Sequence, residues 1–176
     1  MRVKTGILFG AVFVALAVGL VARGGVSTRA TGSSPAVVKA AFNRDLKKTI
    51  VVDARGITLY AFYFDESGKP ACYVDPGFRC VKSWPSCVDD PQYHCVKSWP
   101  PLTTVGRPLA GKGANAKLLG TARRRDGRLQ VVYNHLPLYY YAGGLGAPRD
   151  TKPGDVNGQK LFGLWWVVSP RGLEIK

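Results

Sequence analysis

The stretch LGTARRRDGRLQVVY, residues 119–133, carries the clearest secondary-structure signal in this 176-residue chain. Asp126-Gly127 is a two-residue turn signal with a β-rich run on each side. Asp-Gly favours the tight turns that join antiparallel strands, because glycine adopts positive φ angles without steric cost. We therefore predict a β-hairpin in which residues 119–125 pair with residues 128–133.

Similar runs lie before and after this hairpin. Residues 36–41, 49–52 and 57–64 precede it, and residues 138–141 and 164–168 follow it. Aromatic and β-branched residues dominate these runs, and the periodicity of an amphipathic helix is weak. A helix over residues 36–48 is the alternative for the first run, although it has no good N-cap. The predicted fold class is all-β.

The N-terminal residues have the composition of a secretory signal peptide. Arg2 and Lys4 form a positive segment, and an apolar run over residues 7–22 follows it. That run is shorter than the roughly 20 apolar residues that a membrane-spanning helix needs. We predict a signal peptide over residues 1–22, with cleavage at its end or after Ala30. An uncleaved N-terminal anchor is the alternative.

The predicted domain organisation follows from this signal. Residues 23–35 form a linker rich in small residues, and residues 36–176 form one β domain. We expect the protein in the periplasm or outside the cell, with no membrane span after cleavage. The formal charge of +14 falls to +10 when the four basic residues before Thr31 are removed. This charge favours anionic envelope components as partners, with solubility in an anionic envelope as the simpler explanation, and we expect no physiological nucleic acid ligand.

Four arginines lie at or beside the tip of the predicted hairpin: Arg123, Arg124, Arg125 and Arg128. Guanidinium groups this close together repel one another unless an anion or an acid lies among them, and their fork geometry suits phosphate and carboxylate. Strand alternation places Arg124 on the face opposite Arg123 and Arg125, and Asp126 neutralises part of the charge. The tip is therefore a candidate anion-binding site, with a solvated surface that has no function as the alternative.

All four cysteines fall in one direct duplication. Residues 72–86 read CYVDPGFRCVKSWPS, and residues 87–101 read CVDDPQYHCVKSWPP. An even number of cysteines in an exported chain indicates disulfide bonds, because the destination is oxidising. If each unit carries its own bridge, each bridge closes a loop of about nine residues. The bonds would then be Cys72–Cys80 and Cys87–Cys95.

The spacing of these cysteines differs from that of metal and redox sites. Seven and six residues separate neighbouring cysteines, whereas zinc and thioredoxin-like sites use about two. The chain has only His94 and His135 as histidines, so it offers few further ligands. We expect no metal and no cofactor, and a metal or redox centre that uses His94 beside Cys95 is the alternative.

A fainter repeat spans most of the predicted domain. Residues 50–60 are followed by a Trp-Pro element, and residues 130–139 are followed by the Trp165-Trp166 pair. Each half offers a strand, a turn, a strand with Leu-Tyr, a loop and a tryptophan strand. We predict two β-meander-like repeats, over about 36–102 and about 118–172, and the duplicated cysteine units form a disulfide-stapled insert.

The first Leu-Tyr element continues as Tyr60-Ala61-Phe62-Tyr63-Phe64-Asp65, and a cysteine later precedes Trp-Pro-Pro-Leu at residues 99–102. These features resemble a family of bacterial exported proteins built from a short secreted repeat, described as predicted lipoproteins with a Tyr-x-aromatic-x-x-Asp motif. The resemblance covers roughly residues 36–172. The residues that carry it include Tyr60, Phe62, Asp65, Trp99, Pro100, Asp126, Gly127, Tyr139, Asp155 and Gln159.

The resemblance implies an exported β domain but no activity, because the function of the family is undefined. It also implies a second cysteine arrangement, in which Cys72–Cys95 matches the single bridge of the family and encloses Cys80–Cys87. Both arrangements stay open at this point. The chain departs from the family because it has no lipobox cysteine, and because Gly144 stands where the second repeat should carry the aspartate of the motif.

Asp65 has two interpretations. It is a structural residue of the acidic turn at Glu66-Ser67-Gly68, or it contacts a cation or ligand beside tyrosine hydroxyls. The chain has no G-x-S-x-G, H-E-x-x-H or P-loop motif and no suitably spaced pair of carboxylates, so we expect no enzymatic activity. We predict a non-enzymatic envelope binding or structural module. An electron-transfer or metal-handling accessory protein that uses Asp65 or His94 is the alternative.

Overall fold

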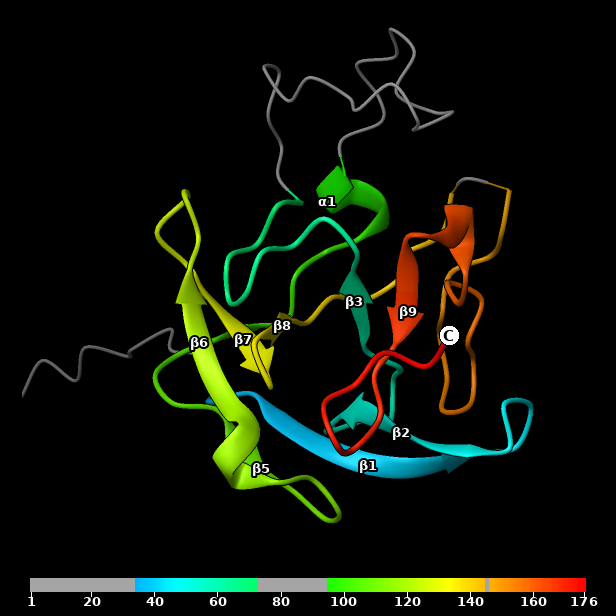
Figure 1. Ribbon diagram of the computed structural model, residues 1–176, viewed down its shortest axis with the longest axis horizontal. Helices are drawn as coiled ribbons and strands as arrows, with labels where there is room; N and C mark the ends of the chain where they lie inside the picture. Colours follow the sequence, from blue (N-terminus) through cyan, green and yellow to red (C-terminus); the bar gives the residue numbers. More distant parts are fainter. Residues whose placement is uncertain (1–33, 73–94, 145) are drawn as a thin grey trace, which may run out of the picture. The chain divides into compact units, whose positions relative to one another are not determined.

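The computed structural model describes residues 34–72, 95–144 and 146–176. The chain divides into residues 1–31 and 32–176, and every described residue belongs to the second unit. Its elements, shown in Figure 1, are β1 (Val37–Asn43), β2 (Lys48–Asp53), β3 (Tyr60–Phe62), α1 (Cys95–Ser98), β4 (Thr103–Thr104), β5 (Leu109–Ala110), η1 (Ala116–Leu118), β6 (Leu119–Arg123), β7 (Leu129–Tyr133), β8 (Leu136–Pro137), η2 (Leu161–Gly163) and β9 (Trp165–Val167). The all-β fold class is confirmed.

The first run of the domain is a strand and not a helix. β1 pairs antiparallel with β2 in a register that runs from Val38 opposite Asp53 to Asn43 opposite Lys48. The Asn43 side chain accepts a hydrogen bond of 2.9 Å from the backbone N–H of Leu46 and so stabilises the turn. The helical alternative over residues 36–48 is wrong, because hairpin pairing satisfies the backbone here and no capping group starts a helix.

The hairpin predicted around Asp126-Gly127 is confirmed. β6 and β7 pair antiparallel from Leu119 opposite Tyr133 to Arg123 opposite Leu129. The strands end earlier than predicted, because residues 124–128 form the turn and the N–H of Gly127, at φ 82°, donates to the Arg124 carbonyl. Arg124 and Arg125 therefore belong to the turn and not to the end of a strand.

The strands form three small sheets rather than one. Their orders are β2-β1-β5, β3-β9, and β4-β7-β6 with β8 beside β7. β3 and β9 lie side by side although they are far apart in the sequence (Figure 1). One hydrophobic cluster gathers aliphatic residues of β1, β2 and β7, and a second gathers the large aromatic residues. The aromatic cluster contains most of the residues on which the family resemblance depends.

Residues before and after the cysteine segment make matching backbone hydrogen bonds. Leu59 N–H donates to the Val51 carbonyl, as Leu138 N–H donates to the Val131 carbonyl. Further matched pairs, with the donor first, are Val51 to Val168 and Val131 to Leu102, and Tyr63 to Leu164 and Ala142 to Ser98. We call residues 34–72 and 95–102 the first half and residues 118–176 the second half. Each half thus supplies the tryptophan segment that pairs with the tyrosine segment of the other or of itself in an equivalent way.

Candidate functional site

Tyr60 and Tyr139 mark the point where the two halves meet. The N–H of each residue donates to the carbonyl of the other, at 2.9 Å in both directions. Both side chains are fully buried. This reciprocal pair places the two tyrosine segments antiparallel to one another, so that the residues that follow each tyrosine face equivalent surroundings.

A column of four aromatic rings passes through this point. Its order is Phe62, Trp165, Trp99 and Tyr141, with centroid distances of 4.3, 3.7 and 4.5 Å between neighbours. Tyr60 lies edge-on to Trp99 at 5.4 Å, and Tyr139 lies edge-on to Trp165 at 5.3 Å. Stacked and edge-to-face rings are the preferred arrangements of aromatic pairs and add stability beyond their buried area. The column therefore joins the two halves through a dense aromatic core.

Each tyrosine hydroxyl bonds a carboxylate of the other half. Tyr60 donates to Oδ2 of Asp150 at 2.5 Å, and Tyr139 donates to Oδ1 of Asp65 at 3.1 Å. The motif residues Tyr60 and Asp65 are therefore not hydrogen-bond partners in the described structure. β3 ends at Phe62 and turns, with the N–H of Asp65 donating to the Phe62 carbonyl at 3.0 Å, so Asp65 points away from the Tyr60 hydroxyl.

Asp150 is the residue that sequence reasoning missed. It is the carboxylate partner of Tyr60, and its other oxygen accepts from the N–H of Asn157 at 2.9 Å. A search at the spacing of the motif finds Gly144 instead, because the longer loop of the second half places the acid six residues further along. The chain offered no local signal for Asp150, since its partner is chosen by tertiary contact.

Three other motif residues have structural roles in the second half. Asp155 accepts from the N–H groups of Thr151 and Lys152 and stabilises that loop. Gln159 bridges β9 and the C-terminal residues, through bonds to the N–H of Val167 at 2.7 Å and the Ile175 carbonyl at 2.6 Å. Pro100 accepts from the Tyr140 N–H through its carbonyl. These residues hold the loops that flank the aromatic column.

Gly158 lies against the same column. A Cβ at this position would lie 2.7 Å from a ring carbon of Trp99, so the close approach of the ring requires glycine. The Gly158 N–H also donates to the Tyr60 hydroxyl at 3.2 Å. The hydroxyl of Tyr60 therefore both donates and accepts, and its hydrogen bonds are made within the protein.

The tyrosine hydroxyls stay protonated in this environment. Burial and then the neighbouring Asp150 carboxylate raise the pKa of Tyr60, and burial and then Asp65 raise the pKa of Tyr139. Burial also raises the pKa of Asp65 to about 8, although the Ala71 N–H and the Tyr139 hydroxyl favour its charged form. The second oxygen of Asp65 is buried without a hydrogen-bond partner among the described residues. A neutral acid is the form that such an oxygen favours.

The raised pKa of Asp65 predicts a pH dependence of stability. In the unfolded chain an aspartate has a pKa of about 3.9, so between about pH 4 and pH 8 the folded state holds a proton that the unfolded state has released. The free energy of unfolding attributable to Asp65 therefore falls as the pH rises through this window, by up to about 1.4 kcal/mol per pH unit. Urea unfolding at pH 5 and pH 8.5 should show the wild type losing stability relative to Asp65→Asn.

The matched control for this prediction is Asp45→Asn. Asp45 is an exposed carboxylate in the β1–β2 turn, so its replacement should leave the pH dependence of the wild type unchanged. A difference between wild type and Asp65→Asn that is the same at both pH values would show that Asp65 does not retain the proton.

The four hairpin arginines do not form one cluster. Arg124 is 2% exposed and points inward, where it donates to the Gln130 side chain and, at 2.7 Å, to the Cys72 carbonyl. Arg128 makes bonds of 3.0 and 2.7 Å to Asp126. Arg123 and Arg125 are exposed, and Arg123 donates to the Gly127 carbonyl. Anion binding at the tip stays a prediction, and it now concerns Arg123 and Arg125 first.

Cys72 and Cys95 form a disulfide with a Cα–Cα distance of 5.4 Å. The arrangement with one bridge in each duplicated unit is therefore wrong, because both of its bridges need a cysteine that this bond uses. The bond joins the end of the loop after β3 to the start of α1 and so fixes the Trp99 segment beside the first half. Cys80, Cys87 and His94 lie outside the described residues, as does the predicted signal peptide.

Two further searches concern metals and membranes. Within residues 34–72, 95–144 and 146–176, no group of three His, Cys, Asp or Glu side chains is arranged to hold a metal ion. Within the same ranges, no helix has the length and apolar character that crossing a bilayer requires.

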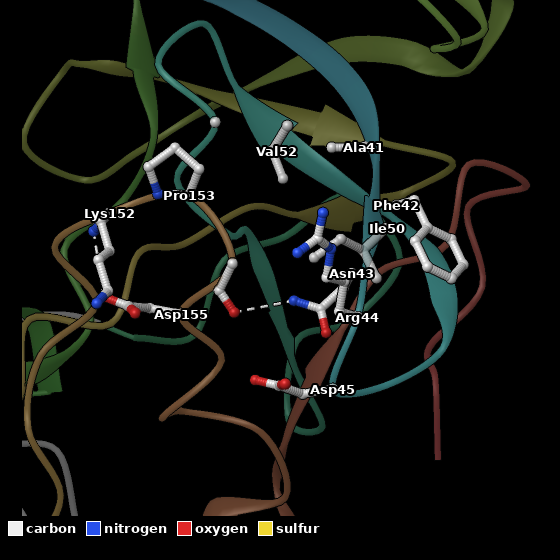
Figure 2. A pocket seen from close by; sticks show the side chains of 12 residues that line it. Ala41, Phe42, Asn43, Arg44, Asp45, Ile50, Val52, Lys152, Pro153 and Asp155 are labelled. Atoms are coloured by element: carbon white, nitrogen blue, oxygen red, sulfur yellow. Dashed lines mark hydrogen bonds between the residues drawn. The ribbon is translucent and has the colours of Figure 1, made fainter.

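Two hollows lie on the described surface. The larger, about 500 Å³, lies between the β1–β2 hairpin and the loop at residues 152–155. Figure 2 shows Asn43, whose side chain donates to the Gly154 carbonyl at 2.9 Å, on one side and Pro153 on the other. Arg44, Asp45, Lys152 and Asp155 line it, so it has no single charge preference. The smaller, about 380 Å³, is lined by Arg55, Arg149 and Tyr140 among others.

Comparison with known proteins gives one match. The model of a family described as a secreted repeat of unknown function matches residues 120–169, which run from β6 to just beyond β9. The resemblance to a secreted-repeat family is thereby confirmed over these residues. No curated protein and no solved structure matches the chain significantly.

Proposed function

Because residues 120–169 match a secreted repeat of unknown function, we propose that the protein is a non-enzymatic binding or structural module of the cell envelope. An envelope address fits a secreted repeat and a disulfide between Cys72 and Cys95. The module would act in the periplasm or outside the cell. Its partners would be anionic envelope polymers, because the mature chain is strongly basic.

The observation that most supports a non-enzymatic module is the position of the family motif. Tyr60, Tyr139, Trp99 and Trp165 are fully buried, and the tyrosine hydroxyls bond carboxylates inside the protein. A catalytic group must reach its substrate through a pocket or cleft. The motif residues instead stabilise the core, so contact with a partner falls to the surface outside the motif.

The contact surface that we propose is the tip of the β6–β7 hairpin. Arg123 and Arg125 are exposed there, whereas Arg124 is buried and serves the fold. Arg128 is exposed but paired with Asp126. A pair of exposed guanidinium groups suits the carboxylates or phosphates of an envelope polymer and gives binding that salt weakens.

Retention on a polyuronate resin tests the role of the hairpin. Arg123→Ser/Arg125→Ser should elute at clearly lower NaCl than the wild type, because it removes two exposed charges from the proposed contact. Arg107→Ser/Arg171→Ser is the control, since both are exposed arginines elsewhere and the net charge changes equally. Equal shifts for the two variants would contradict a specific surface, and no shift for either would contradict electrostatic retention.

We also propose that the two halves are repeats of one structural unit. The matched backbone bonds and the exchange of tyrosine–carboxylate bonds support this proposal. In such an arrangement one repeat cannot complete its own hydrogen bonds, so the second repeat is required for a stable core.

A further inference from the structure

The smaller hollow, which we call the Arg55 cleft, joins residues from three separate segments. Arg55 and Ile57 come from the turn between β2 and β3, Pro100 and Tyr140 from the paired tyrosine and tryptophan segments, and Arg149 from the loop before Asp150. Its volume of about 380 Å³ lies within the range of small-ligand sites. The two arginines therefore face one cleft although 93 residues lie between them in the chain.

The donors of these arginines exceed the carboxylates that meet them. Arg149 is exposed, and among the described residues no acidic side chain lies within ion-pair distance of its guanidinium. Arg55 bonds Asp53 through Nε at 3.0 Å, with its side chain 73% exposed. A guanidinium has five N–H donors, and Nε is one of them. Two such groups at one cleft favour an anion.

The acids at the cleft are already occupied by other donors. Asp150 accepts from the Tyr60 hydroxyl and the Asn157 N–H. Asp53 accepts from the backbone N–H groups of Arg55 and Ile57 at 2.9 and 2.8 Å, and from the Tyr140 hydroxyl at 3.2 Å. These carboxylates therefore fix the walls of the cleft, and a bound anion would meet the arginines rather than displace an acid.

The rest of the lining suits a sugar ring. Ile57, Pro100 and the Tyr140 ring supply an apolar wall, and Arg55 lies over the Tyr140 ring at 5.9 Å. Thr151 adds a hydroxyl to the lining. Ligand sites combine such apolar walls with a few polar groups that fix orientation. A ring with C–H groups on one face and a charged substituent fits this combination better than a free inorganic anion does.

We propose that the Arg55 cleft binds one anionic sugar unit, with Arg55 and Arg149 on its carboxylate or phosphate group and the ring against Tyr140 and Pro100. The proposal names a ligand class and a surface different from the hairpin. It rests on the proposed function only for the place where such sugars are met, in the polymers of an envelope.

Titration calorimetry on the full chain tests the cleft with soluble probes. We expect trigalacturonate to bind and a neutral galactose trisaccharide not to bind. Arg149→Gln should weaken trigalacturonate binding about tenfold, the effect of losing one charge-assisted contact. Arg171→Gln, which removes an exposed arginine elsewhere, should leave the affinity unchanged. Galactose 6-phosphate tests whether a phosphate serves as well as a carboxylate, and binding of either charged sugar supports the proposal.

Three results would overturn the proposal. They are unchanged affinity in Arg149→Gln, an equal loss in Arg171→Gln, and binding of inorganic phosphate as tight as that of the charged sugars. Thermal unfolding of each variant checks that the fold is kept. Arg123→Ser/Arg125→Ser should still bind trigalacturonate in solution, so failure of the hairpin proposal and failure of the cleft proposal give different results.

Discussion

Replacing Trp99 with alanine is expected to lower the free energy of unfolding by about 3–5 kcal/mol. Trp99 is fully buried and lies between Trp165 and Tyr141 in the aromatic column, with Tyr60 against its edge. Removing the ring leaves a cavity where the two halves meet, and the surrounding large rings cannot all move to fill it. Urea unfolding followed by far-ultraviolet circular dichroism measures the loss without depending on tryptophan fluorescence.

Trp166→Ala is the control for this prediction. Trp166 is the neighbour of Trp165 on β9, but it is only half-buried and lies outside the column. Its replacement should therefore cost clearly less than the replacement of Trp99. Equal losses in the two variants would show that the aromatic column does not make the special contribution described here.

Tyr60→Phe is expected to lower the free energy of unfolding by about 1–3 kcal/mol, or more if the charge of Asp150 stays buried. The substitution removes the donor to Oδ2 of Asp150 and the acceptor for the Gly158 N–H, and it keeps the ring against Trp99. Both partners would then be left without their bond in a region from which water is largely excluded. The same urea experiment measures this effect.

Tyr63→Phe provides the comparison for Tyr60→Phe. Tyr63 follows β3 closely in the chain but is 58% exposed, so loss of its hydroxyl should change stability by no more than about 0.5 kcal/mol. A cost for Tyr60→Phe as small as that for Tyr63→Phe would mean that the buried hydroxyl contributes nothing beyond its ring.

Features with local signals could be predicted from the sequence. The Asp126-Gly127 turn and the β-rich runs on both sides gave the β6–β7 hairpin, because turn chemistry and strand propensity act within a few residues. Strand alternation placed Arg124 on a different face from Arg123 and Arg125, and Arg124 is buried while the other two are exposed. Here a period of two residues was enough to separate a structural arginine from surface arginines.

Features that depend on tertiary contact could not be predicted. The motif suggested that Tyr60 and Asp65 act together, whereas Tyr60 bonds Asp150 and Asp65 bonds Tyr139. The cysteine spacing allowed two pairings, and loop length does not choose between them. The Arg55 cleft joins residues that no local pattern connects. In each case the partner is determined by how the two halves pack and not by distance along the chain.

The measurement that tests the account most directly is a pair of double-mutant cycles at Tyr60. One cycle combines Tyr60→Phe with Asp150→Asn, and the other combines Tyr60→Phe with Asp65→Asn. The structure predicts a coupling energy of about 1 kcal/mol or more in the first cycle and within about 0.5 kcal/mol of zero in the second. Coupling between Tyr60 and Asp65 without coupling between Tyr60 and Asp150 would contradict the exchange of tyrosine–carboxylate bonds between the two halves.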